Sequence, residues 1–572
     1  MQNQRLFAWA LFGLLLLMTW QQWQEDYGPK PPAQTALADT DVDTTVGDIP
    51  GDLDTLPGDE LDALPDLDAA PSSTNPTAIE TAPQLQALPT ADRTLITVKT
   101  DVLNIKIDPQ GGDIVSATLP AYPVDKDTPD VLVELLSDQP SDFAVFRSGL
   151  ATRDAENGPN HRALFSAAQT EYELADGASS IEVSLVWQGA DGVVVTKRYT
   201  FQAGQYGITL DLEINNGSEA SWDAAPYARI VHVAEVPKRS LFDVDSYSFA
   251  GPVTFDGSEY DKHTIKDLGK SSYSASGVTG GWVAAIEHHF LSAIVPPSDS
   301  PSKLEARLSG DQFLAGFVGN AVRVEAGTST TIPVELFVGP KLQDQLRTVS
   351  DRLPLTVDYG ILTLLADPLF WVLSKVHNVV GNWGWAIVLV TLLIKLVFYK
   401  LTEQSGRSMA KMRNLQPRLK ALQERYKDDR QKLSEAMMDL YKREKVNPAA
   451  GCLPILIQMP FFLAFYWVLL ESVEMRQAPF MLWINDLSSR DPLFILPILM
   501  GAAMLAQQQL NPAPADPIQA RVMRILPIVF TVFFAFFPAG LVLYWFTNTI
   551  LGVAQQWQIN RVVTREGLKQ RA

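Results

Sequence analysis

Residues 525–553 read ILPIVFTVFFAFFPAGLVLYWFTNTILGV, an apolar stretch interrupted by Pro538-Ala539-Gly540. As one helix the stretch would be about 43 Å long at 1.5 Å per residue, which exceeds the hydrocarbon core of a bilayer. A single helix would also place the basic tail 561–572 outside the cell, against the positive-inside rule. Two short helices joined at Pro-Ala-Gly satisfy both constraints, so we predict two membrane spans here.

Four other apolar segments precede this one. They are Leu6–Trp20, Trp383–Tyr399, Cys452–Leu470 and Leu493–Ala506. The first is followed by bulky and polar residues, including Trp23, where a signal-peptide cleavage site needs small ones. We therefore interpret it as an uncleaved anchor, and the chain is predicted to cross the membrane six times with both termini in the cytoplasm.

The charge of the loops agrees with this topology. Residues 400–445, predicted to be cytoplasmic, carry 13 Lys/Arg and 7 Asp/Glu, whereas residues 471–491, predicted to lie outside, carry 2 and 4. A basic inner side favours contact with the anionic phospholipids on the inner face of a membrane. The formal net charge of the whole chain, −19, argues against DNA as a partner.

The N-terminal half contains a tether and a β-rich domain. Residues 31–90 hold 12 acidic residues, 9 prolines and no Lys or Arg, a composition typical of disordered segments. From residue 94 to about 345 apolar residues alternate with polar ones, and one such run ends at the turn signal Asn215-Asn216-Gly217. The clearest alternation occurs at Ile181, Val183, Leu185 and Trp187, and at Ile208, Leu210, Leu212 and Ile214. We expect a large β-sandwich-type domain outside the cytoplasm.

These patterns predict a multi-domain membrane protein. The expected segments are an N-terminal transmembrane anchor (1–24), an acidic, proline-rich disordered linker (25–92), a periplasmic β-sandwich domain (93–350), an amphipathic interfacial segment (351–382), transmembrane helix 2 (383–403), a cytoplasmic helical hairpin (404–446), transmembrane helix 3 (450–471), a periplasmic loop (472–491), transmembrane helices 4, 5 and 6 (492–510, 520–538 and 540–560) and a basic cytoplasmic tail (561–572).

The predicted cytoplasmic hairpin rests on two apolar stripes at helical spacing. The first stripe is Met409, Met412, Leu415, Leu419 and Leu422, and the second is Leu433, Met437 and Leu440, after a polar break at 427–429. Such stripes predict two helices that pack antiparallel. Two readings stay open and are compatible: the stripes only pack on each other, or the basic outer face also meets ribosomal RNA or lipid head groups.

Lys395 lies inside an apolar span, in the sequence Leu392-Leu393-Ile394-Lys395-Leu396-Val397. A cation there costs roughly 2.5–3.5 kcal/mol on insertion scales, so it needs a reason. One reading is that the side chain reaches the inner head groups, since Lys400 follows five residues later. The other interpretation is that Lys395 shares a water-filled cavity with polar residues of the spans. Each of those polar residues could also serve only as a contact between helices. Those residues are Thr391, Gln458, Tyr544, Thr547 and Asn548.

Signals of enzymatic chemistry are weak. The single cysteine, Cys452, excludes an intramolecular disulfide and a multi-cysteine zinc site. The adjacent His288 and His289 would point to opposite faces of a strand, so we expect structural histidines instead of a metal site. Gly269-Lys270-Ser271 lacks the earlier glycine of a phosphate-binding loop. We therefore predict no catalytic residues, no metal and no cofactor.

The C-terminal part resembles the YidC/Oxa/Alb family of membrane protein insertases, and the whole chain resembles the Gram-negative YidC form. The segments that carry the resemblance are NWGWAIVLVTLLIK (382–395), SMAKMRNLQPRLK (408–420), VNPAAGCLPILIQMPFFLAFY (446–466), RQAPFMLWINDLSSRDPLFILPILMG (476–501) and FFPAGLVLYW (536–545), with LITVKTDVLNIKIDPQGGDIVSATLPAYP (95–123) and GGWVAAIEHHF (280–290) in the outer domain. It implies a periplasmic β-supersandwich, a five-helix insertase core and the hairpin.

The resemblance also implies a hydrophilic groove with one positive charge, closed to the outside. Lys395 matches that charge, where the bacterial form usually has arginine, and lysine lacks the bidentate fork. The implied groove residues are Lys395, Thr391, Gln458, Tyr544 and Asn548, and the implied apolar substrate contacts are Phe462, Phe533 and Phe536. The implied partners are nascent membrane proteins, the Sec translocon and the ribosome.

Two other classes of protein remain open from the sequence. A small-solute transporter would also have polar residues inside the membrane, but usually shows internal repeats. A membrane-tethered glycan-binding protein would account for the β-domain, but would leave the basic C-terminal part without a role.

Overall fold

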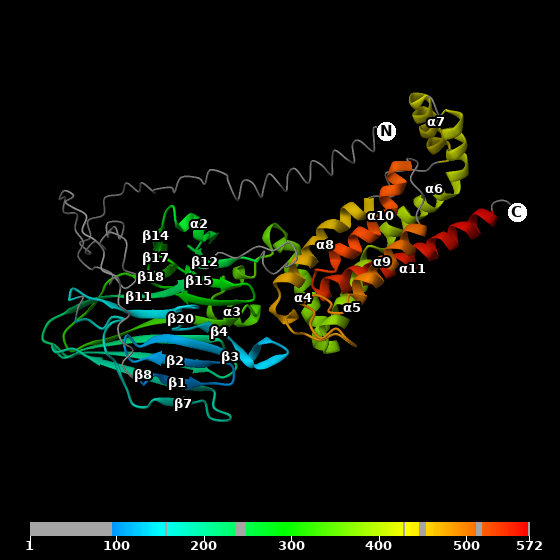
Figure 1. Ribbon diagram of the computed structural model, residues 1–572. Helices are drawn as coiled ribbons and strands as arrows, with labels where there is room; N and C mark the ends of the chain where they lie inside the picture. The colour runs from blue at the N-terminus through cyan, green and yellow to red at the C-terminus, as the bar shows by residue number, and fades with distance from the viewer. Residues whose placement is uncertain are drawn as a thin grey trace, which may run out of the picture. The chain divides into compact units, whose positions relative to one another are not determined.

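The computed structural model describes residues 94–569 except for a few short gaps. These gaps are 155–156, 235–247, 427–428, 445–452 and 511–516. The described residues fall into two compact units. The β unit comprises 94–361 and 468–478, and the helical unit comprises the remainder (Figure 1). The predicted anchor (1–24) and linker (25–92) lie outside the described residues.

The first sheet of the β unit has eleven strands among the described residues. Its order is β14-β17-β18-β11-β5-β3-β2-β1-β7, with β19 paired to β11 and β4 to β3. The strands are β1 (Ile96–Lys99), β2 (Asn104–Asp108), β3 (Asp113–Asp125), β4 (Thr128–Leu136), β5 (Ala144–Ala151), β7 (Glu171–Glu173), β11 (Trp222–Val233), β14 (Tyr273–Val278), β17 (Ser302–Ser309), β18 (Gln312–Gly319) and β19 (Val322–Val324). Of these pairings only β1–β7 is parallel.

The second sheet has nine strands in the described part, in the order β13-β12-β15-β16-β20-β10-β9-β8-β6. They are β6 (Ser166–Ala167), β8 (Ser180–Gln188), β9 (Val193–Gln202), β10 (Gly207–Asn216), β12 (Ala250–Phe255), β13 (Tyr260–Lys262), β15 (Trp282–Glu287), β16 (Phe290–Val295) and β20 (Ser329–Pro340). The central pair β10–β20 is antiparallel, from Gly207 opposite Phe337 to Asn215 opposite Ser329. Two short helices, α2 (Ile265–Leu268) and α3 (Gln343–Val349), belong to the same unit.

The core of this unit lies between the two sheets. Ile208, Leu210, Leu212 and Ile214 of β10 are each fully buried, as predicted. In β8 Val183 and Leu185 are fully buried, whereas Ile181 and Trp187 are half-buried. A contact between the two sheets shows that they face each other. Lys197 of β9, in the second sheet, donates hydrogen bonds to the backbone carbonyl of Gly111, between β2 and β3, and to that of Ser148 in β5 of the first sheet. The β-sandwich-type domain is therefore confirmed.

The histidine pair departs from the prediction. His288 has φ +44° in the turn between β15 and β16, so the chain is not extended there. As a result the rings of His288 and His289 stack with centroids 3.7 Å apart, instead of pointing to opposite faces of a strand. The prediction of opposite faces was wrong because it assumed that a strand continued through the turn.

The helical unit begins with α4 (Thr363–Val380) and α5 (Trp383–Val397). The other helices are α6 (Tyr399–Arg425), α7 (Arg430–Arg443), α8 (Leu453–Glu471, whose last four residues belong to the β unit), α9 (Ile495–Leu510), α10 (Pro517–Phe534) and α11 (Ala539–Lys569). Asn382 caps α5 by accepting a hydrogen bond from the backbone N–H of Trp385 at 3.0 Å. We expected one helix over 383–403, but the chain bends by 69° between α5 and α6.

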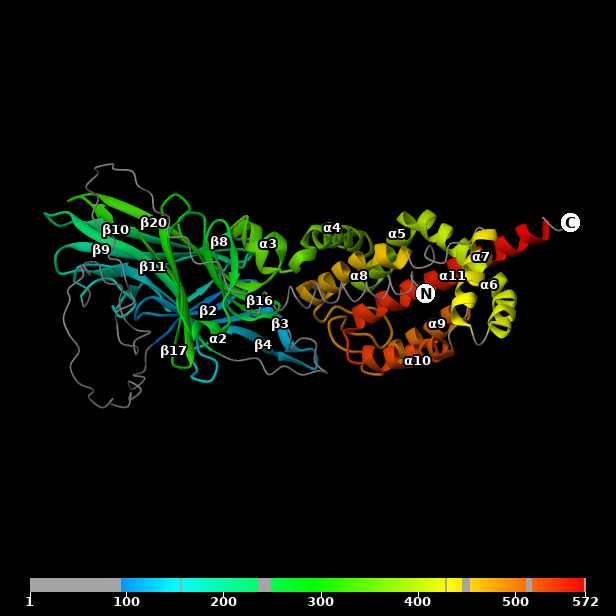
Figure 2. The same ribbon diagram turned by 90° about the horizontal axis from the view of Figure 1, so that it is seen from above.

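Helix α11 is the centre of the helical unit. It packs on α5, α6 and α9, while α10 packs on α9 and α4 packs on α5 (Figure 2). The break between α10 and α11 is held by a neighbouring loop, since the N–H groups of Ala539 and Gly540 donate to the carbonyls of Ser489 and Leu487 at 2.7 and 2.8 Å. Two N–H groups at the start of α11, which have no partner within the helix, are therefore satisfied.

Helices α6 and α7 pack on each other through the two apolar stripes. Leu415 and Leu419 are buried against the partly buried side chains of Met412, Met437, Leu440 and Tyr441. Asp429 caps α7 by accepting from the N–H of Lys432 at 3.0 Å. Nearer its start, α6 packs on α11 through Ala410, Ile559 and Val563.

None of the described helices alone is long and apolar enough to cross a membrane, and α5 with α6 meets the requirement only as a bent pair. The segments Ile457–Glu471 and Ile495–Leu510 are shorter apolar helices.

Candidate functional site

Lys395 lies in the last turn of α5, on the side that meets α11. A Cβ built on Gly552 of α11 would lie 3.8 Å from the Lys395 ammonium nitrogen and 3.1 Å from Nε2 of Gln507 on α9. Lys395 and Gln507 are each half-buried. The ammonium therefore lies beside two neighbouring helices, and the absence of a side chain at Gly552 leaves it the space to do so.

Thr391, one turn before Lys395, is buried with 1% of its surface exposed. Its hydroxyl donates to the carbonyl of Ile387 at 2.6 Å, so its proton is used within its own helix. Thr391 therefore serves α5 itself and has only its oxygen lone pairs left to offer a ligand.

Tyr544 and Phe462 lie together in an aromatic cluster between α8 and α11. Their ring centroids are 5.7 Å apart and their ring planes are nearly parallel. The ring centroid of Phe465 lies 4.8 Å from that of Tyr544. Phe462 also meets Trp545 edge-on at 4.6 Å. Tyr544 is only 5% exposed, so this cluster is part of the packing between the two helices.

Gln458 and Asn548 are both half-buried. Nε2 of Gln458 is buried and has no hydrogen-bond partner within the described residues. In that part of the chain, no hydrogen bond joins Lys395 to the four other groove residues expected from the sequence. The structure thus brings Tyr544 and Phe462 into contact, and leaves Lys395 with neighbours that were not predicted.

Phe533 and Phe536 belong to the end of α10 and the segment after it. Phe533 is 52% exposed and contacts the rings of Phe534 and Phe537, whereas Phe536 is half-buried. Phe533 is exposed together with other apolar side chains of α10, namely Val522, Ile525, Ile528, Val529 and Val532. An exposed apolar face of this kind suits a lipid or an apolar segment of another chain.

Sequence reasoning missed Gln507 and Gly552. The signal that could have found them is the run Gln507-Gln508-Gln509, which ends an apolar segment with three consecutive amides. Helices α9 and α11 also form an apolar groove of about 460 Å³ next to these residues in sequence. It is lined by Ala506, Gln509, Leu510, Ile550, Val553, Ala554 and Trp557.

A second polar feature lies in the β unit, where residues 468–478 join the sandwich. Glu471 forms an ion pair with Lys341, whose Nζ lies 3.3 Å from its Oε2, and both side chains are buried. Arg476 donates to the carbonyls of Pro123 and Val124, each at 2.9 Å. Burial raises the pKa of Glu474 in the same segment to about 7. This segment is therefore fixed to the sandwich by buried and charge-assisted contacts.

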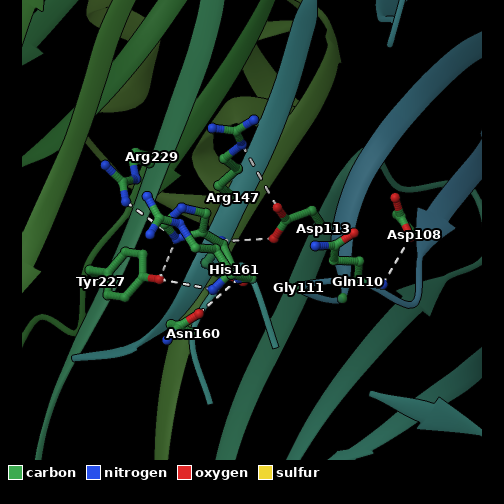
Figure 3. Close-up of polar contacts among 12 residues, drawn as sticks. Asp108, Gln110, Gly111, Asp113, Arg147, Asn160, His161, Tyr227 and Arg229 are labelled. Atoms are coloured by element: carbon green, nitrogen blue, oxygen red, sulfur yellow. Dashed lines mark hydrogen bonds and ion pairs between the residues drawn. The ribbon is translucent and has the colours of Figure 1, made fainter. Parts of the chain in front are cut away.

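The sandwich also contains a buried polar cluster, drawn in Figure 3. Nδ1 of His161 lies 2.7 Å from the hydroxyl of Tyr227 and 3.3 Å from Nη2 of Arg229, while Asp113 accepts from the N–H of Ser148 at 3.3 Å and faces Arg147 at 3.9 Å. These contacts are typical of a buried polar network that stabilises a core.

Burial shifts the protonation of this cluster. Desolvation raises the pKa of Asp113 to about 7, although Lys197 and Arg147 oppose the shift. Desolvation, helped by Arg229, lowers the pKa of His161 to about 2. His161 therefore stays neutral at physiological pH, and its Nδ1 lone pair accepts from the neighbouring donors.

Comparison with known proteins now identifies the family. A model described as the YidC periplasmic domain matches residues 95–372, and one described as the 60Kd inner membrane protein matches residues 375–566. Together they define the class, a membrane protein with a periplasmic domain. Membrane protein insertases YidC from Thioalkalivibrio sulfidiphilus and Nitrosococcus oceani are 46% and 45% identical to this chain, covering 100% and 99% of it and 100% of each relative.

A solved structure of an active YidC insertase, with its first transmembrane domain resolved, is 19% identical, with a TM-score of 0.37, and the match covers 81% of this chain and 92% of that one. The chain belongs to the YidC family of membrane protein insertases, a conclusion that rests on the relatives of high identity and full length.

Proposed function

We propose that this chain inserts nascent proteins into the bacterial inner membrane through a polar recess whose positive charge is Lys395. One observation carries the proposal: a Cβ built on Gly552 of α11 would lie 3.8 Å from the Lys395 ammonium nitrogen and 3.1 Å from Nε2 of Gln507 on α9. A cation held among helices costs free energy and is typical of a functional site. Thr391, Gln458, Tyr544 and Asn548 are proposed to line the recess more distantly, and Phe462, Phe533 and Phe536 to contact apolar parts of the substrate.

The magnitudes support an electrostatic role for the ammonium. A carboxylate that enters the bilayer alone costs about 3 kcal/mol. A fixed ammonium about 4 Å away returns up to roughly 4 kcal/mol at an effective dielectric constant near 20. One cation can therefore offset the passage of one acidic residue in a short tail. The apolar segment that follows then moves into lipid, driven by the burial of its own side chains, without nucleotide hydrolysis.

The test compares Lys395→Arg, Lys395→Ala and Lys395→Glu in cells depleted of the natural protein. Lys395→Arg should insert all substrates, whereas the other two should impair substrates with acidic translocated tails by about tenfold, the factor that corresponds to 1.4 kcal/mol. Protease protection of the tail measures insertion. Lys400→Ala, an exposed lysine nearby, is the matched control. Equal insertion by all variants would refute the electrostatic step.

The proposed topology has six spans with the sandwich in the periplasm and both termini in the cytoplasm. The spans would be the segment 1–24 and helices α5, α8, α9, α10 and α11, with the segment boundaries expected from the sequence. The excess of basic residues in 400–445 over 471–491 supports this orientation. Reporter-enzyme fusions within 471–491 should be active only outside the cytoplasm, and fusions after residue 569 only inside.

The helix pair α6–α7 is proposed to be a cytoplasmic hairpin that contacts the ribosome or anionic head groups, while the chain acts alone or beside the Sec translocon. Lys411, Arg413 and Lys420 are exposed on it, which supports a basic docking face. Changing these three residues to Gln should weaken co-sedimentation with ribosomes that carry a nascent membrane protein. Substitution keeps the contact of α6 with α11, which a deletion would disturb. Lys432→Gln, which removes an ammonium paired with Asp429, is the control.

A further inference from the structure

The space beside Gly552 is approached by nitrogen atoms from two different helices. Lys395 of α5 and Gln507 of α9 both direct their terminal nitrogen toward the point where a Cβ of residue 552 would be, at 3.8 and 3.1 Å. Within the described part of the chain, neither side chain has a hydrogen bond or an ion pair. Two donor groups, neither of them hydrogen-bonded within the described residues, therefore approach the same space.

The chemistry of these donors selects an anion with two acceptor oxygens. The ammonium supplies up to three N–H groups and a full charge, but it is a point donor without a preferred plane. The amide of Gln507 supplies two further N–H groups in a fixed plane. A carboxylate can accept from the ammonium with one oxygen and from the amide with the other, and hydrogen bonds with a charged partner are about twice as strong as neutral ones.

We propose that Gln507 is a second substrate-binding residue and that Lys395, Gln507 and Gly552 together form a subsite for one Asp or Glu side chain of the inserting polypeptide. The proposal rests on the insertase function proposed above and deepens it. Lys395 supplies charge, Gln507 supplies orientation, and the missing side chain at Gly552 supplies room. The subsite favours a single acidic residue over two adjacent ones, because one cation faces it.

Gly552 allows a test that separates binding from folding. An alanine at this helical position removes the entropic disadvantage of glycine, so Gly552→Ala should hold or increase thermal stability. Its Cβ would nevertheless lie 3.1 Å from Nε2 of Gln507 and crowd the site. We expect Gly552→Ala to lower insertion of an acidic tail severalfold, and Gly552→Leu to lower it further, while neutral tails insert normally.

The decisive experiment uses three reporter proteins that differ only in their translocated tail, which carries no charge, one Asp or one Lys. Gln507→Leu should lower insertion of the Asp tail by about tenfold, the loss expected for one hydrogen bond to a charged group, and leave the neutral tail unchanged. Gln507→Glu should block the Asp tail more strongly, because its carboxylate would occupy the ammonium, but should spare the Lys tail. Gln509→Leu, from the same run of glutamines, is the matched control.

The outcomes separate this inference from the proposed function. If Lys395→Ala impairs the Asp tail but Gln507→Leu does not, the subsite is wrong and the electrostatic function stands. If Lys395→Ala impairs neither tail, the function proposed for Lys395 fails as well. Equal loss of neutral and acidic tails in Gln507→Leu would show a structural role for the amide and would also overturn the subsite.

Discussion

Replacing Lys341 by methionine should weaken the β unit strongly. The ammonium of Lys341 lies 3.3 Å from Oε2 of Glu471 and 3.4 Å from the carbonyl of Thr356, with 3% of the residue exposed. The substitution keeps the length of the side chain but leaves the Glu471 carboxylate buried without its counter-charge. Removing one partner of a buried ion pair typically costs 3–5 kcal/mol. For a unit of this size 1 kcal/mol lowers the melting temperature by about 2–4 °C, so we expect a decrease of roughly 6–20 °C.

The assay is thermal unfolding of the full chain in lipid nanodiscs, followed by the circular dichroism of the strands. Lys262→Met is the matched control, because Lys262 pairs with Asp358 but keeps 36% of its side chain exposed, and such pairs contribute about 1 kcal/mol or less. The double variant Lys341→Met/Glu471→Leu should recover most of the loss, since it leaves no buried charge. If Lys341→Met and the Lys262→Met control had the same melting temperature, the reasoning would be refuted.

Three further predictions concern other parts of the chain. Because the pKa of Asp113 is raised to about 7, its protonated form stabilises the fold below that pH, and this contribution is lost as the pH rises through 7. The pKa of His161 is lowered to about 2, so this residue has the opposite effect: it destabilises the fold as the pH falls below 6.5. The melting temperature of Asp113→Asn relative to wild type should therefore fall as the pH is lowered from about 8 to 5, and a constant difference would contradict this. Leu419→Ala, at a residue 8% exposed, should speed proteolysis within α6–α7 without changing the melting of the strands. Gly384→Val should lower the yield of folded protein, because a Cβ at this position would lie 2.1 Å from the ring of Phe480, and normal yield would show that the loop can move.

Patterns of neighbouring residues in the sequence predicted the secondary-structure elements that depend only on those neighbours. The alternation from Ile208 to Ile214 predicted a half-buried strand, and β10 has that pattern of burial. The turn signal after it coincides with the end of β10 at Asn216. The stacked histidines could not be predicted, because the turn at His288 depends on how β15 and β16 pair and not on the two residues themselves.

The surroundings of Lys395 depend on contacts between distant segments. The lysine itself stands out in an apolar span, but its neighbours Gln507 and Gly552 follow more than 100 residues later. A glycine in a helix is conspicuous only when the side chains opposite it are known. The same holds for the pair Lys341–Glu471, which joins residues 130 positions apart, and for Lys197, which is fully buried in spite of its charge.

The β unit is discontinuous in the chain, since residues 468–478 complete it after α4, α5, α6, α7 and most of α8. On a ribosome that adds about 5–20 residues per second, this last piece is completed roughly 6–23 s after Ile361. During that interval the ion pair of Lys341 with Glu471 cannot form. The hydrogen bonds from Arg476 to the carbonyls of Pro123 and Val124 are also absent. The β unit of a newly made molecule is therefore completed late, only after helices α4 to α7 and most of α8 have been synthesised.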